Sequence, residues 1–225
     1  MVIQGGSITT SGDQHFAELV ILDKTDVSTN VITTLTSKID NFQLSAISAE
    51  PKTAPIGGVV VIQEIFGVNS HIRSVADGYA ADGYFVVAPA TFHRAKAGVE
   101  LGYTEADMTA GFGLKTAVEA LPAPGVMPDI QAAIDHAAQG GKVGIVGYCW
   151  GGLLTWRSAC TLKGLSAAAP YYGGGMTAEG DASRAPTVPV MAHFGDQDHW
   201  IPLDTVEAFK KAQPGVTVHV YNANH

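Results

Sequence analysis

The sequence predicts an α/β domain with a mostly parallel central sheet and helices on both of its faces. From about residue 59 to the end of the chain, short apolar segments rich in β-branched residues alternate with helical segments. This alternation is typical of right-handed βαβ units, which align strands in parallel and place helices over the sheet. The composition agrees, because 46% of the residues are hydrophobic and only 15% are charged, as in a domain that buries its sheet.

Residues 1–35 are the least regular part of the sequence, and we interpret them as an N-terminal extension to a single domain over residues 36–225. Residues 15–22 have the composition of a strand, and residues 31–35 form a short β-branched segment. Both favour an additional strand or hairpin at the edge of the sheet. We find no residues in the extension that indicate a chemical role.

The first half of the domain begins with a strand whose residues alternate, over residues 42–47. A loop rich in proline and glycine follows, and then residues 59–62 form a continuous β-branched run that is typical of a strand buried on both faces. A helix is predicted over 71–81, where Asp82-Gly83 ends it, and a strand over 84–88, which Pro89 ends. Residues 100–120 favour a helix that two glycines weaken.

The second half repeats the pattern with clearer boundaries. Pro128 begins a helix over 129–139, and Gly140-Gly141 ends it. Strands are then predicted over residues 142–148, 166–172, 188–194 and 216–221, and helices over residues 150–163 and 203–211.

Charge and hydropathy exclude several classes of partner. The net charge is −8 without a cluster of lysine and arginine, so we expect no nucleic acid. No apolar run reaches the ~18 residues that span a bilayer, and the first twelve residues do not resemble a signal peptide. We therefore expect no membrane association and a cytoplasmic location. The histidines lack the spacing of a zinc site, and no cofactor or metal is expected.

The strongest chemical signal is Cys149, which lies between a predicted strand and a predicted helix in the sequence GYCWGG. The pattern G-x-nucleophile-x-G is the nucleophile elbow of α/β-hydrolases, whose tight turn requires the small residues Gly147 and Gly151. A helix N-terminus favours an anion and therefore a reactive thiolate. The Trp150 N–H could bind a tetrahedral oxyanion. The other cysteine, Cys160, is interpreted as a small buried hydrophobic residue.

An acid and a base follow Cys149 in the order that this fold requires. Asp198 lies in the loop after the strand 188–194, and Asp196 in the same loop is the alternative acid. His225 follows the last predicted strand, where the general base belongs. The remaining histidines are less suitable, because they lie within a strand, beside the acid in the wrong order, or far from the elbow: His15, His71, His93, His136, His193, His199 and His219.

A second candidate segment directly follows the strand 59–62. The loop in this position supplies the second oxyanion donor in α/β-hydrolases, here the Ile65 N–H. Glu64 precedes it, and a carboxylate at this place would lie near the thiol. We expect it either to keep the resting cysteine protonated or to neutralise it by hydrogen bonding.

Three segments together resemble the dienelactone hydrolase (carboxymethylenebutenolidase) family. They are VVVIQEIFGVN, GKVGIVGYCWGG and HFGDQDHWIP, in this order, and the resemblance covers residues 38–225. It implies an α/β-hydrolase fold without metal or cofactor, and a triad of Cys149, His225 and Asp198. It also implies that Glu64 contacts the nucleophile at rest, and that the reaction opens the ring of dienelactone to give maleylacetate.

Two departures from the family concern the substrate. Family enzymes that use dienelactone bind its carboxylate with two arginines, and this sequence has no arginine between Arg94 and Arg157. Arg94 and Lys115 are the candidate substitutes. The second arginine follows the catalytic histidine, and the family continues there into a last helix, so we expect either a natural chain that extends beyond His225 or an ordered part that ends there.

The sequence thus predicts a hydrolase of a small ester or lactone. A broader carboxylesterase or thioesterase on the same fold remains an alternative, as do a catalytically silent binding protein and a redox sensor based on Cys149. The sequence does not specify an oligomeric state.

Overall fold

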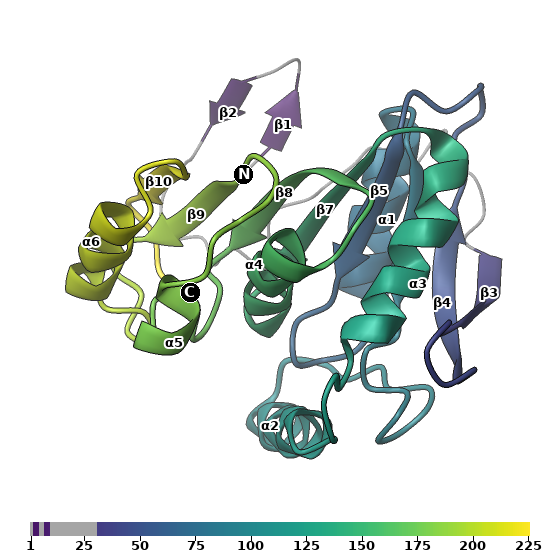
Figure 1. Ribbon diagram of the computed structural model, residues 1–225, viewed down its shortest axis with the longest axis horizontal. Helices are drawn as coiled ribbons and strands as arrows, with labels where there is room; N and C mark the ends of the chain where they lie inside the picture. Colours follow the sequence, from purple (N-terminus) through teal and green to yellow (C-terminus); the bar gives the residue numbers. More distant parts are fainter. Residues whose placement is uncertain (1, 5–6, 10–30) are drawn as a thin grey trace.

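A computed structural model describes residues 2–4, 7–9 and 31–225 of the chain. In this part of the chain, eight strands form one sheet in the order β10-β9-β8-β7-β5-β6-β4-β3 (Figure 1). The strands are β3 (Val31–Thr36), β4 (Gln43–Ala49), β5 (Gly58–Ile62), β6 (Phe85–Pro89), β7 (Val143–Tyr148), β8 (Leu165–Tyr171), β9 (Met191–Gly195) and β10 (Thr217–Tyr221). β4 is antiparallel to both of its neighbours, β3 and β6, and all other neighbouring strands in this sheet are parallel. The short strands β1 (Val2–Gln4) and β2 (Ser7–Thr9) pair with each other in a separate sheet.

Helices cover both faces of the sheet, as predicted. One face carries α1 (Ser70–Ala81), and the other carries α3 (Met127–Ala137), α4 (Trp150–Thr161) and α6 (Leu203–Ala212) (Figure 1). The short α5 (Glu179–Ala182) follows β8, and a 3-10 turn, Ala138–Gly140, extends α3. The remaining helix, α2 (Glu105–Glu119), lies beyond the sheet rather than against either of its faces (Figure 1). None of these helices is long and apolar enough to cross a membrane.

The predicted α/β architecture is confirmed, and two elements begin three or more residues later than predicted. The helix predicted from residue 100 begins at Glu105, because Thr104 forms a capping box with Asp107. Residues 99–101 instead run beside the turn after β5, where Gly67 and Glu100 form an isolated bridge. The strand predicted from residue 188 begins at Met191. Within the extension, Val31–Thr36 is the edge strand β3, whereas residues 15–22 lie outside the described part of the chain.

The central strand β5 explains why the sheet needs helices on both faces. All five of its residues are buried, and their side chains alternate between two apolar clusters. Val60 and Ile62 pack with the cluster beneath α3 and α4, and Val59 and Val61 pack with the cluster beneath α1. Burial of apolar side chains on both faces is the main contribution to the stability of such a sheet.

The strand order also determines where a site can form. From β5 the chain moves to β6 on one side and returns to β7 on the other. Neighbouring connections therefore leave the sheet in opposite directions at the carboxyl ends of β5 and β7, which creates a crevice. Glu64 and Ile65 follow β5, and Cys149 follows β7, so the topology brings the two candidate segments together.

Arg94 links the residues around Asp40 to α3. Its guanidinium donates hydrogen bonds to both carboxylate oxygens of Asp129, at 2.6 Å, and to Asp40, and it lies over the Phe42 ring at 4.2 Å. Asp129 is only 1% exposed. Because a buried carboxylate is costly without a partner, this ion pair is a structural contact. Arg94, one of the two candidate cations for binding a substrate carboxylate, is therefore already paired within the protein.

Replacing Arg94 by Met should lower the free energy of unfolding by about 3 kcal/mol, because Asp129 would remain buried without its partner. Urea denaturation of the purified variant measures this loss. Lys38→Met is the matched control, since Lys38 pairs with Asp135 at an exposed position and should cost less than about 1 kcal/mol. Equal losses in the two variants would contradict the structural role of Arg94.

Candidate active site

Cys149 occupies a strained turn between β7 and α4. It is the N-cap residue of α4, with φ 53° and ψ −120°, a region that residues other than glycine rarely enter. Its N–H donates to the Tyr171 carbonyl at 3.1 Å, which ties the turn to β8. The geometry places the sulfur at the positive end of the α4 dipole, where a thiolate is stabilised.

Two glycines make this turn sterically possible. A Cβ added at Gly147 would lie 2.3 Å from the Gly151 carbonyl oxygen, and one added at Gly151 would lie 2.3 Å from the Gln63 carbonyl oxygen. Both distances are far shorter than a van der Waals contact. The clashing atoms belong to the backbone, so they cannot move aside for a larger residue. The small residues of the elbow therefore let α4 begin directly against the segment that follows β5.

His225 and Asp198 form a hydrogen-bonded pair at the carboxyl end of the sheet. Nδ1 of His225 lies 2.7 Å from Oδ2 of Asp198. The other oxygen of Asp198 accepts the N–H groups of Trp200 and Ile201, at 2.8 and 3.2 Å. These bonds hold the carboxylate in a fixed orientation toward the imidazole.

The alternative acid, Asp196, has a different contact. Its Oδ1 accepts the N–H of Ala223 at 3.3 Å, so it holds the loop that carries His225 rather than the imidazole. The backbone N–H groups of Asp196 and Gln197 donate to Tyr221 and Ala223, both at 2.9 Å. The acid loop and the histidine loop are therefore joined along their backbones.

The imidazole of His225 interacts with both Asp198 and Cys149. Burial alone would lower the pKa of His225, but its hydrogen bonds to Asp198 and to Cys149 outweigh burial and raise the pKa from 6.5 to about 10. The imidazole is therefore protonated at neutral pH, and its positive charge faces Asp198 and Cys149. Tyr172 packs edge-on against the imidazole, with ring centroids 4.8 Å apart.

The two amides expected to bind an oxyanion are free to do so. Within the described part of the chain, neither the Trp150 N–H nor the Ile65 N–H donates to a protein acceptor. Trp150 is the first residue of α4, where an N–H has no intrahelical partner. Both residues are buried, with exposures of 1% and 3%.

Glu64 is buried beside the same site, with 5% exposure. Its carboxylate accepts hydrogen bonds from the hydroxyl groups of Tyr103 and Tyr172, at 3.0 and 3.5 Å. Burial raises the pKa of Glu64, while the tyrosines and the charge of His225 oppose that shift. Contact between Glu64 and the thiol at rest stays a prediction.

Sequence reasoning missed both tyrosines. Tyr172 follows β8 at the carboxyl edge of the sheet, and that position could have indicated it. Tyr103 lies in a segment predicted as helix, so it carried no such signal. Asn69, the N-cap of α1, donates to the Tyr103 hydroxyl at 3.4 Å. The hydroxyl therefore lies between an amide and the Glu64 carboxylate.

Other side chains singled out in the sequence have structural contacts. Lys115, the second candidate for binding a substrate carboxylate, pairs with Glu119 at 2.8 Å. Of the aromatic residues near the motifs, Phe66 and Phe92 are buried, whereas Trp200 is 66% exposed. Among the described residues, no group of three or more histidine, cysteine, aspartate or glutamate side chains is placed to hold a metal ion.

Replacing Asp198 by Asn should lower the pKa of His225 from about 10 toward its ordinary 6.5, because the hydrogen-bonded carboxylate is lost. NMR titration of the ring measures this pKa, with the resonance assigned from its absence in His225→Gln. A raised pKa stabilises the folded protein below pH 6.5, and this contribution disappears as the pH rises through about 10. Asp196→Asn is the control, and an equal shift in that variant would contradict the assignment of Asp198.

Comparison with known proteins places the sequence in a family. The sequence model of the dienelactone hydrolase family matches residues 44–225. A carboxymethylenebutenolidase of Pseudomonas putida is 33% identical over 193 residues, which cover 81% of this chain and 79% of that protein. A Synechocystis protein assigned as a carboxymethylenebutenolidase is 32% identical over 216 residues, covering 89% of this chain and 82% of that protein.

A solved structure gives the same result. The crystal structure of a Klebsiella pneumoniae protein assigned as a dienelactone hydrolase superposes with a TM-score of 0.71 at 29% identity, and the match covers 88% of each chain. Family members of this kind are hydrolases that act on esters or lactones. The chain described here therefore belongs to the dienelactone hydrolase family and is a hydrolase of that class.

Proposed function

We propose that this protein hydrolyses small esters or lactones with the Cys149 sulfur as nucleophile, His225 as base and Asp198 as the residue that orients the base. The observation that carries the proposal is the position of the imidazole. One of its nitrogens is 2.7 Å from Asp198, and the ring also lies close enough to Cys149 for that side chain to contribute to its raised pKa. This is the arrangement of a nucleophile, a base and an orienting acid in acyl transfer.

In the acylation step, the Cys149 thiolate attacks the carbonyl carbon of the substrate and forms a carbon–sulfur bond. The carbonyl oxygen becomes an oxyanion that accepts hydrogen bonds from the N–H groups of Trp150 and Ile65. When the intermediate collapses, the bond to the ester oxygen breaks, and His225 gives its proton to that oxygen. In a lactone, the released hydroxyl or enol stays attached to the acyl group.

In the deacylation step, His225 takes a proton from a water molecule, and the resulting hydroxide attacks the thioester. The carbon–sulfur bond breaks, the acid leaves, and the thiolate and imidazolium are restored. Glu64 is proposed to interact with the cysteine before substrate binds and to be displaced by substrate. Its burial beside Tyr103 and Tyr172 supports a position close to the nucleophile.

The family reaction, ring opening of dienelactone to maleylacetate, is the first candidate substrate reaction. A second candidate is hydrolysis of uncharged esters, which two observations favour. Arg94 is engaged by two aspartates, so it is not available to a substrate carboxylate. Two exposed aromatic rings also lie next to site residues: Phe112 follows Gly111 on α2, and Trp200 donates its N–H to Asp198, with ring centroids 6.0 Å apart. Exposed aromatic surface of this kind favours contact with apolar substrate groups.

The decisive test is hydrolysis of dienelactone and of p-nitrophenyl acetate by the purified protein and by Cys149→Ala. Loss of turnover in the variant, by at least about 10³-fold, is expected because the nucleophile is removed. Cys160→Ala is the matched control, since Cys160 lies within α4 and burial raises the pKa of its thiol to about 11. It should retain full activity.

Each outcome separates the candidates. Cysteine-dependent turnover of dienelactone would support the family reaction, and turnover of the neutral ester alone would support the second class. Turnover that persists in Cys149→Ala would contradict the cysteine mechanism. Turnover of neither substrate by the unchanged protein would favour a binding protein without catalysis.

Replacing Trp200 by Ala should raise KM for esters with a long or aromatic acyl group by about tenfold, because an apolar surface that covers the substrate is lost. KM for the acetate ester should change little. Steady-state kinetics with acetate, butyrate and benzoate esters measure the difference. Ile56→Ala is the control, because Ile56 is 69% exposed and precedes β5, at the opposite end of the sheet. Uniform KM changes across the series would exclude a role of Trp200 in selecting the acyl group.

A further inference from the structure

The helix α2 contacts both of the residues whose amides are proposed to bind the oxyanion. A Cβ added at Gly111, in the middle of α2, would lie 2.3 Å from the carbonyl oxygen of Ile65 and 3.2 Å from its carbonyl carbon. At the end of the same helix, Glu119 accepts a hydrogen bond from Nε1 of Trp150 at 3.1 Å. The two contacts are eight residues apart on one helix, so a single rigid element spans both amides.

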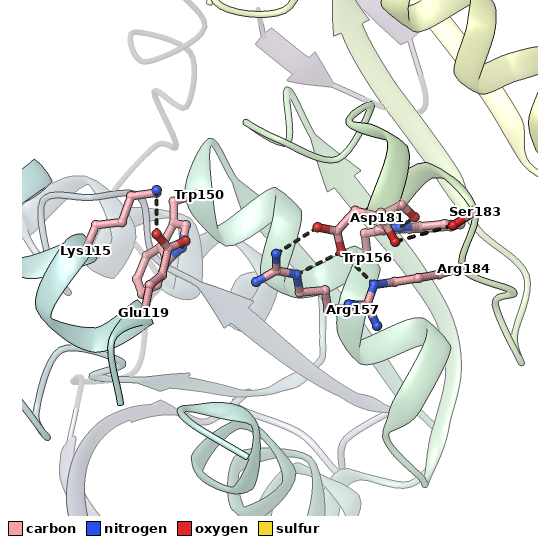
Figure 2. A network of polar contacts seen from close by, with 9 residues as sticks. Lys115, Glu119, Trp150, Trp156, Arg157, Asp181, Ser183 and Arg184 are labelled. Carbon is pink, nitrogen blue, oxygen red and sulfur yellow. Dashed lines mark hydrogen bonds and ion pairs between the residues drawn. The ribbon is translucent and has the colours of Figure 1, made fainter. Parts of the chain in front are cut away.

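The contact at Glu119 fixes the indole ring of Trp150. Figure 2 shows the Glu119 carboxylate between this indole and the ammonium group of Lys115. The ring is buried and stacks on Phe92, with centroids 5.2 Å apart and an interplanar angle of 18°. The indole is thus restrained at one face and at its N–H. Because the ring and the amide belong to the same residue, restraining the ring restrains the start of α4.

The segment that leads into α2 is fastened to the turn that carries Ile65. The Leu101 N–H donates to the Phe66 carbonyl at 2.8 Å, and the Asn69 side chain donates to the Leu101 carbonyl at 3.0 Å. Gly67 approaches Val99 so closely that an added Cβ would lie 2.0 Å from its carbonyl oxygen. The turn after β5 and the entry to α2 therefore form one packed unit.

The stability of α2 alone does not explain why glycine occupies position 111 and glutamate occupies position 119. Gly111 weakens a helix interior. Glu119 is the last residue of α2, where the helix dipole disfavours an acid. Its pair with Lys115 has lysine preceding glutamate by four residues, which is the weaker orientation of such a pair. Both residues are better explained by what they contact outside the helix.

We propose that α2 is a positioning element for the oxyanion hole, in which Gly111 sets the backbone at Ile65 and Glu119 sets the backbone at Trp150 through its indole. This inference rests on the proposed acyl-transfer function of the site. Glu119 and Gly111 touch no reacting atom and act through the two amide donors. Their loss should therefore weaken stabilisation of the transition state without altering the thiolate.

Two pairs of variants test the proposal with matched controls. Gly111→Ala and Gly113→Ala both add a methyl group to α2, but a Cβ at Gly113 meets nothing within 4 Å. Glu119→Leu removes the acceptor for the indole, whereas Glu119→Gln retains a side-chain oxygen that can accept the same hydrogen bond. Melting temperatures establish that each variant is folded, and Gly113→Ala and Glu119→Gln should keep the activity of the unchanged protein.

The readout compares two reactions of Cys149. Hydrolysis of p-nitrophenyl acetate passes through an oxyanion, whereas alkylation by iodoacetamide, followed by mass spectrometry of the Cys149 peptide, does not. We expect kcat to fall by about 10- to 100-fold in Gly111→Ala and Glu119→Leu, with KM nearly unchanged. The rate of alkylation should stay within about twofold of the unchanged protein.

Three outcomes would overturn the proposal. The first is equal activity of Gly111→Ala and Gly113→Ala together with full activity of Glu119→Leu. The second is a parallel loss of hydrolysis and alkylation, which would mean that the variants disturb the thiolate and not the oxyanion hole. The third is a loss of activity in Glu119→Gln as large as the loss in Glu119→Leu. Failure of the proposed function itself is distinguishable, because hydrolysis by the unchanged protein would then be absent or independent of Cys149.

Discussion

The close approach of α4 to the end of β5 is the constraint on which the rest of the site depends. Gly151 packs against the Gln63 carbonyl, and Gly147 packs against Gly151, so the chain must turn at Cys149 with a positive φ. Strain of this kind costs about 1–3 kcal/mol and persists only where surrounding structure holds it. Here it places the sulfur, the start of α4 and the turn with Glu64 within one crevice.

Most of the fold could be predicted because the sheet is buried on both faces. Continuous β-branched runs such as Val59–Ile62 have few alternatives to a central strand, and glycine or proline marks their ends. The elbow could be predicted for a related reason, since its glycines are required by steric contact. Boundaries were less certain where a local signal competed with the pattern, as at Thr104, whose capping box begins α2 later than its composition suggests.

The partners of the candidate residues could not be predicted, because they depend on contacts between distant segments. Arg94 looks like a free cation in sequence, yet its aspartate partners lie 35 and 54 positions away. Tyr103 lies 39 residues from Glu64 and shares no motif with it. From the sequence, Gly111 is expected only to destabilise the helix. The close approach of the Ile65 backbone explains why no larger residue fits at this position.

The charges around the proposed nucleophile bear on which substrate the proposed reaction can take. The imidazolium of His225 is held between Asp198 and Cys149, so its charge is matched before substrate arrives. Glu64, a second buried acid, is satisfied by neutral hydroxyl groups rather than by a cation. An ionised Glu64 repels a substrate carboxylate but not a neutral ester, and this difference is the electrostatic basis for proposing uncharged esters as the second substrate class.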